Sequence, residues 1–169
     1  QSSTNDWLFG YLTYDLKNDV EALSSKNHDE LHFPDLYFFQ PKKLFLISDT
    51  HIELSYLNFV ADELETDWKD ILEFATETKS ASEANPVKIS VRTSKDSYFE
   101  KVNTMLRHME RGDIYEANFC QEFYSEGTQI DPLKTFFHLN TISKPPFASF
   151  FKHQSHYALS ASPERYLLK

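Results

Sequence analysis

The sequence predicts an α+β fold in which antiparallel sheets pack against helices. Runs rich in aromatic and β-branched residues are separated by short polar turns, which is typical of antiparallel strands. Amphipathic runs that begin and end with helix-capping residues lie between these strands. Helix followed by strands recurs along the chain, but no sequence repeat of fixed period indicates a solenoid.

The first half of the chain is rich in strand signals. Residues 7–15 have the aromatic and apolar density of a buried strand, and residues 17–26 suit a surface turn or short helix. Pro41 and the polar run 48–50 then separate further strands that we expect to pair as antiparallel neighbours. These strands are residues 36–39, 43–48 and 51–56.

Capping residues mark the helices. An apolar stripe predicts an amphipathic helix over residues 62–78. Ser94 can cap a second helix that Gly112 ends, and Asp131-Pro132 repeats the same start signal. The remaining predicted strands are residues 114–124, 147–152 and 157–161.

Composition limits the classes of function. The chain has 169 residues, enough for one domain with its own core. A net charge of -9 without a basic run argues against nucleic acid and anionic membranes as partners. Only three glycines occur, and none forms a phosphate-binding Gly-rich loop. Cys120 is the single cysteine, and no signal peptide or membrane-spanning run is found, so we expect a reducing cytoplasm.

The domain organisation is simple. We expect residues 1–169 to form a single partial domain, a fragment of a longer chain. The best candidate for an internal boundary is the loop at residues 78–86, although it is short for an interdomain linker.

Two carboxylates can be considered as site residues from the sequence alone. In the strand predicted over residues 114–124, Glu116 lies on a mixed face that is either solvent-exposed or part of a site. Glu164 follows Pro163, and a carboxylate there is either a surface group or, beside its apolar neighbours, a partly desolvated general acid. His28 and His32 do not match the zinc-protease pattern.

Several segments in order carry a family resemblance. Residues 112–121 read Gly-Asp-Ile-Tyr-Glu-Ala-Asn-Phe-Cys-Gln, residues 146–150 read Pro-Phe-Ala-Ser-Phe, and residues 162–165 read Ser-Pro-Glu-Arg. They resemble the chorismate-binding enzymes, which include the large subunits of anthranilate, aminodeoxychorismate and isochorismate synthases. The resemblance covers nearly the whole chain and implies part of that family's layered α/β/β/α fold.

The resemblance implies roles for particular residues. Glu164 would be the general acid that protonates the leaving C4 hydroxyl of chorismate. Glu116 stands where isochorismate-forming relatives have a water-activating lysine and ammonia-using relatives have glutamine, so it would lie on the substrate side and bear on the choice of nucleophile. Pro146, Phe147 and Ala148 align with a segment that lines a tryptophan pocket in relatives.

The resemblance also implies an activity. Pro-Phe followed by small residues is more similar to component I of aminodeoxychorismate synthases, which aminate chorismate for para-aminobenzoate and folate, than to anthranilate synthases, which usually have Pro-Tyr-Met there. The implied partners are chorismate and a glutamine amidotransferase subunit, with tryptophan as a further ligand. Magnesium would serve the complete enzyme, but its ligands and the nucleophilic lysine would lie beyond Lys169, so we expect no metal site and no activity in these residues alone. The alternatives are anthranilate synthase component I and a non-catalytic module that binds an aromatic amino acid or a subunit.

Overall fold

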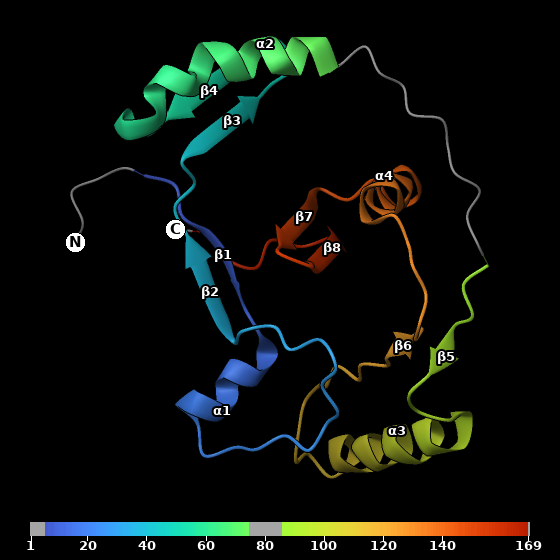
Figure 1. The fold of residues 1–169 in the computed structure, drawn as a ribbon. Coiled ribbons are helices and arrows are strands. Elements are labelled where there is room, and N and C mark those ends of the chain that lie inside the picture. The colour runs from blue at the N-terminus through green and yellow to red at the C-terminus, as the bar shows by residue number, and fades with distance from the viewer. Residues whose placement is uncertain (1–5, 75–85, 169) are drawn as a thin grey trace. The chain divides into compact units, whose positions relative to one another are not determined.

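The computed structural model describes residues 6–74 and 86–168 (Figure 1). The loop predicted at residues 78–86 therefore lies, except for Pro86, outside the described residues, as does the end of the helix predicted over residues 62–78. The α-helices and strands in chain order are β1 (Phe9–Leu12), α1 (Lys17–Val20), β2 (Leu36–Phe39), β3 (Lys43–Ile47), β4 (Ile52–Tyr56), α2 (Leu64–Phe74), β5 (Ser90–Val91), α3 (Lys95–Glu110), β6 (Phe123–Tyr124), α4 (Pro132–Ser143), β7 (Phe147–His153) and β8 (His156–Ser162).

The chain groups into two compact units, which are described separately. The first comprises Gln1–Ser80 with the turn His153–His156, and the second comprises Ala81–Lys152 and Tyr157–Lys169. The described strands form four two-stranded sheets, in which β1 pairs with β2, β3 with β4, β5 with β6, and β7 with β8. Small antiparallel sheets accompanied by helices confirm the α+β class.

The first sheet differs from the prediction in its pairing. Strand β2 pairs with β1, antiparallel from Phe9 opposite Phe39 to Leu12 opposite Leu36, and not with the next strand along the chain. Pro41 breaks the chain between β2 and β3 before a hairpin can form. The turn His153–His156 contacts this unit through aromatic rings, with the His153 ring 4.5 Å from that of Tyr37.

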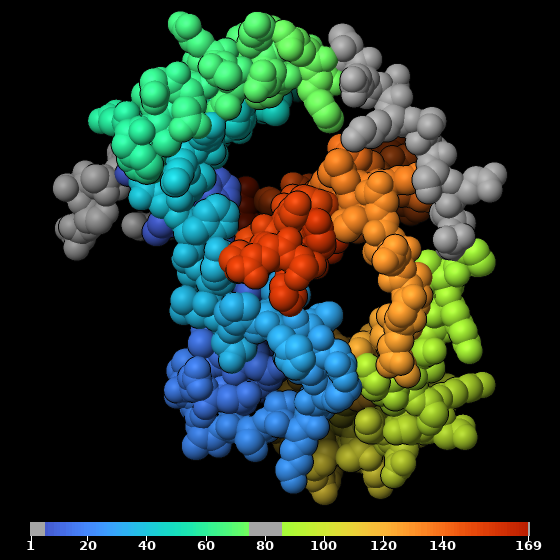
Figure 2. Space-filling view, in the orientation of Figure 1, coloured from blue at the N-terminus to red at the C-terminus, as the bar shows by residue number. Residues whose placement is uncertain are grey.

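A network of charged and hydroxyl groups joins β3, β4 and α2. The ammonium of Lys43 lies 2.6 Å from a carboxylate oxygen of Glu63 and 2.5 Å from one of Asp67. The hydroxyl of Tyr56 donates a hydrogen bond of 2.7 Å to the same Asp67 carboxylate. In Figure 2 the atoms of α2, in green, lie directly against those of β3 and β4. The network therefore fixes the helix on one face of this sheet.

Helix α3 begins and ends where the sequence predicts. The Ser94 side chain accepts a hydrogen bond of 3.3 Å from the backbone N–H of Ser97, which caps the first turn. At the other end Gly112 adopts φ +78°, and the backbone N–H groups of Gly112 and Asp113 donate to the carbonyls of Met109 and His108. This is a Schellman motif, which glycine permits because it has no Cβ.

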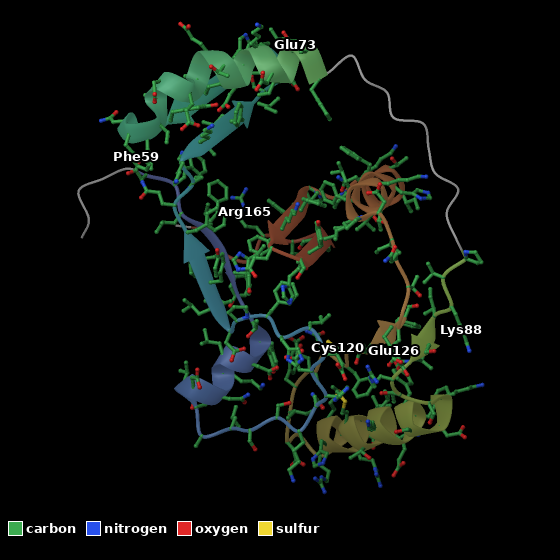
Figure 3. The ribbon with its side chains drawn as sticks, viewed as in Figure 1. Phe59, Glu73, Lys88, Cys120, Glu126 and Arg165 are labelled. Atoms are coloured by element: carbon green, nitrogen blue, oxygen red, sulfur yellow. The ribbon has the colours of Figure 1, made fainter. Side chains whose placement is uncertain are left out.

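The long strand predicted over residues 114–124 is wrong for most of its length. Only β6, Phe123–Tyr124, is a strand, and it pairs with the short β5, which the sequence analysis did not predict. Residues 114–122 lack regular structure because no described strand pairs with them, and isolated extended backbone has no ladder of hydrogen bonds to hold it. Cys120, labelled in Figure 3, is an exposed free thiol in this segment.

The last three elements match the prediction closely. Asp131 caps α4 by accepting a hydrogen bond of 3.0 Å from the backbone N–H of Lys134, with Pro132 as the first helical residue. The helix ends at Lys144 in the left-handed region, and prolines come next. Strands β7 and β8 have seven residues each and are joined by the two-residue turn Gln154-Ser155.

Residues 6–74 and 86–168 do not show the expected core. Among the described residues Val60 is the only buried apolar side chain, at 7% exposure. Large apolar residues on the longer helices remain half exposed, including Leu72 of α2, Phe99 of α3 and Phe137 of α4. Two-stranded sheets with single helices offer too little surface to one another to bury such side chains. The prediction that these residues build a core of their own is therefore wrong, as is the prediction that residues 7–15 form a buried strand.

Candidate active-site segment

The turn that carries Glu164 comes directly after β8. Ser162, the last residue of β8, uses its hydroxyl twice: it accepts a hydrogen bond of 3.3 Å from the backbone N–H of Glu164 and donates one of 2.8 Å to the carbonyl of the same residue. Pro163 between them restricts φ to a narrow range. The backbone of the turn is thus fixed by two neighbouring residues.

The Glu164 side chain itself is exposed. The sequence suggested that its apolar neighbours could partly desolvate it. Phe150 and Phe151 of β7 are half-buried, but they leave the carboxyl group open to water. Among the described residues the expected apolar shielding of Glu164 is therefore not seen. The role of Glu164 as general acid stays a prediction.

Arg165 connects this turn to the first residue of β7, at the same end of the hairpin. Its guanidinium carbon lies 5.2 Å from the centre of the Phe147 ring, within the range of a cation–π contact. Phe147 is the first residue of β7 and Ser162 the last of β8, so the equal lengths of the two strands bring both to the open end of the hairpin. Arg165 is labelled in Figure 3.

The structure thereby brings together two of the predicted sites. Sequence reasoning treated the segment Pro146–Ala148 and the acid Glu164 as separate features, yet Phe147 and the turn of Glu164 are neighbours through Arg165. The two-residue turn at the middle of the hairpin could have predicted this, because residues equidistant from it face one another. Pro146 and Ala148 are exposed and Phe147 is half-buried.

Glu116 lies in the irregular segment after α3 and is exposed. Its neighbour Tyr115 is 95% exposed, so this part of the chain has little packing of its own. Within the described residues, neither a hydrogen bond nor an ion pair joins Glu116 to Glu164. The influence of Glu116 on the nucleophile stays a prediction.

Sequence reasoning missed the network around Lys43. The hydrogen bonds that Lys43 donates to Asp67 and then to Glu63 raise the pKa of Lys43. Those that Asp67 accepts from Lys43 and then from Tyr56 lower the pKa of Asp67. No sequence signal pointed to it, because its members come from separate elements. Each carboxylate of the network is paired with the Lys43 ammonium, which indicates a structural rather than a chemical role.

A pocket in the first unit lies apart from the predicted site residues. It is lined by Asp6, Trp7, Gln40, Pro41, Leu44, Ser55, Tyr56 and Leu57. The lining contains one carboxylate and several apolar side chains, and none of Glu116, Phe147 and Glu164 contributes to it.

The described residues show no cluster of magnesium ligands. Magnesium is usually held by carboxylates together with substrate and water oxygens. Across residues 6–74 and 86–168 no group of three or more acidic, histidine or cysteine side chains is placed to hold a metal. No chemical step is therefore assigned to a metal on these residues. Likewise, no helix in the described part of the chain is long and apolar enough to cross a membrane.

Comparison with known proteins decides the family. The sequence profile described as chorismate binding enzyme matches residues 1–169. The chain belongs to the chorismate-binding enzyme family. This confirms the resemblance seen in residues 112–121, 146–150 and 162–165.

Several members of the chorismate-binding family are similar in sequence. The anthranilate synthase component I-like protein of Synechocystis sp. is 30% identical over 160 residues, which cover 94% of this chain and 33% of that protein. Aminodeoxychorismate synthase component 1 of Klebsiella aerogenes is 24% identical over 158 residues, covering 94% of this chain and 34% of that protein. The chain spans about a third of the length of these relatives.

A solved structure confirms the fold. Anthranilate synthase component I from Streptococcus pneumoniae TIGR4 superposes with a TM-score of 0.76 at 17% identity. The match covers 97% of this chain and 40% of that chain. The chorismate-binding fold therefore accounts for these residues even where they lack a core of their own.

Proposed function

We propose that this chain is the amino-terminal portion of an aminodeoxychorismate synthase component I, which converts chorismate and ammonia to 4-amino-4-deoxychorismate. The observation that carries the proposal is the family match over residues 1–169 together with Pro146-Phe147-Ala148, where anthranilate synthases usually have Pro-Tyr-Met. Relatives named aminodeoxychorismate synthase component 1 from Klebsiella aerogenes and Bacillus subtilis support it.

In this proposal, residues 1–169 complete their site only within the longer enzyme. Glu164 projects from a turn whose backbone Ser162 holds, and its exposed carboxyl group is free to face a surface added by the rest of the protein. That surface would remove water from the acid and keep its proton available. The acid then protonates the C4 hydroxyl of chorismate, which leaves as water, since hydroxide is a poor leaving group.

The remaining components of the reaction come from outside these residues. The relatives are named component 1 or component I, which supports a second subunit, and we assign to it the release of ammonia from glutamine. Magnesium and the nucleophile belong to the remainder of the enzyme, in the cytoplasm. Glu116 would lie on the substrate side, and tryptophan is a candidate ligand of the segment Pro146–Ala148.

The test uses the complete enzyme with chorismate, ammonium and magnesium. Replacing Glu164 by glutamine keeps the side-chain size and removes the proton donor, so turnover should fall by at least about a hundredfold. The matched control is Glu126→Gln, a change of another exposed glutamate in the same unit, which should leave turnover unchanged. Unchanged turnover in Glu164→Gln would remove the acid role.

Anthranilate synthase component I is the second candidate. The similarity to the Synechocystis protein, named anthranilate synthase component I-like, favours it. Product analysis separates the two candidates, because the first releases 4-amino-4-deoxychorismate and the second releases anthranilate. Anthranilate as the main product would overturn the first proposal and leave the assignment to the chorismate-binding family unchanged.

A further inference from the structure

We infer that Arg165 is a positioning residue, which holds the turn of Glu164 in place by packing its guanidinium on the Phe147 ring. The inference rests on the proposed function, because Glu164 must first be the acid. It is based on the observed contact between Arg165 and Phe147, which links two segments that the sequence analysis considered separately.

The turn is held firmly on the side of β8. Ser162 binds both the N–H and the carbonyl of Glu164, and Pro163 limits the backbone between them. These restraints fix the start of the turn. They do not fix the direction in which the chain leaves it, which depends on the contacts of the residues after Glu164.

On the far side of the turn, packing is weak. Tyr166, Leu167 and Leu168 are exposed, at 94%, 79% and 75%. Arg165 is the residue between the acid and this exposed run, and its guanidinium lies 5.2 Å from the centre of the Phe147 ring. Among the described residues, this contact therefore supplies the second anchor of the turn.

Phe147 is a suitable anchor because it belongs to a strand. It is the first residue of β7 and is half-buried. It lies at the open end of the hairpin, where Ser162 is the last residue of β8. A planar guanidinium stacks on an aromatic face with a preferred orientation, which limits the motion of the residue before it. A proton donor displaced by about 1 Å can cost about a hundredfold in rate, so such an anchor matters for catalysis.

A double-mutant cycle in the complete enzyme tests the contact. Arg165→Ala and Phe147→Leu should each lower kcat about ten- to a hundredfold and leave KM within about twofold, because the acid acts in the chemical step. The double variant should be no slower than the slower single variant, since both changes remove the same contact. Arg165→Lys and Phe147→Tyr, which keep a cation and a ring face, should recover part of kcat.

Lys152→Ala is the matched control. Lys152 lies over the Tyr157 ring at 5.6 Å in the same hairpin, next to the turn at its other end. Its loss removes a contact of the same kind without touching the acid, so kcat should stay unchanged. A loss of kcat in this variant equal to that in Arg165→Ala would show general damage to the hairpin and overturn the inference.

Two other outcomes would overturn the inference while leaving the proposed function intact. In the first, Glu164→Gln abolishes turnover, but the losses in kcat for Arg165→Ala and Phe147→Leu simply multiply. In the second, Arg165→Ala raises KM and Phe147→Leu does not, which would make Arg165 a substrate-binding residue acting alone. Unchanged turnover in Glu164→Gln would instead remove the proposed acid and the inference with it.

Discussion

The segment from β3 to α2 and the segment from β7 to the Glu164 turn differ in how their charged side chains are paired. In the first, Lys43, Asp67 and Tyr56 bind one another across three elements, so the charged groups are satisfied within the segment. In the second, hydrogen bonds fix only the backbone, and the Glu164 carboxyl group is left exposed. The charged groups of the first segment bind one another, whereas the Glu164 carboxyl group of the second, which has the predicted chemical role, remains available to another surface.

The two segments are alike in one respect, since both leave large apolar side chains exposed. Polar groups can be paired by a few neighbours, but burial needs a second layer over a whole face. Leu72 on α2 and Tyr157 on β8 are both exposed by more than a third. Local chemistry therefore shapes the elements, while the described residues bury little apolar surface to stabilise the fold.

The largest expected effect concerns residues 1–169 expressed alone. With Val60 as the one buried apolar residue among those described, calorimetry should show no cooperative unfolding transition. A folded domain absorbs about 0.7 kcal/mol per residue near 60 °C, and the isolated chain should absorb far less. An unfolding enthalpy of the full size would contradict this prediction. It would mean that both segments fold stably without an added layer, and the contrast between them would be lost.

The next largest effect is expected from disrupting the charged network around Lys43, and it is measured as a change in the thermal midpoint of the complete enzyme. Lys43→Met should lower the midpoint at pH 7, because Glu63 and Asp67 lose their shared cation. The pKa of Asp67 is lowered in the folded protein, mainly by Lys43, so its stabilising contribution is present above its unfolded pKa of about 3.9 and is lost as pH falls further. The difference between variant and wild type should therefore shrink as the pH is lowered below about 4.

Lys42→Met is the control for this experiment. It removes the same charge from the adjacent position, where the lysine lies over the exposed Phe59 ring at 5.7 Å. Its midpoint should stay near that of the wild type at every pH. If the two variants behaved alike, the network would contribute nothing specific and the contrast between the segments would be lost.

The smallest effect concerns the end of α3. Gly112→Ala should destabilise the complete enzyme by about 1–2 kcal/mol, because alanine is strained at φ +78°. Space does not add to the loss, since a Cβ there would meet no atom within 4 Å. Gly112→Asn should lose less, as asparagine tolerates the left-handed region. Urea unfolding measures both, and equal stability of Gly112→Ala and wild type would mean that the turn has another conformation.

The sequence predicted those parts of the fold that depend on neighbouring residues. Ser94, Gly112 and Asp131 act within one turn of the helix that they cap, and the β7–β8 hairpin is set by its own two-residue turn. The predicted strand at residues 114–124 failed because a strand needs a partner, and alternation of side chains does not supply one. The pairing of β2 with β1 was missed for the same reason.

For the candidate site, the sequence identified Glu164, Glu116 and the segment Pro146–Ala148 through the family they share, and the family is confirmed. Only the tertiary structure revealed that Arg165 joins Phe147 to the turn of the acid, and that Lys43 binds two carboxylates at once. Capping and turn formation involve residues a few positions apart, so the sequence determines them. Contacts across many positions depend on how the strands pair, and that is decided only when the chain folds.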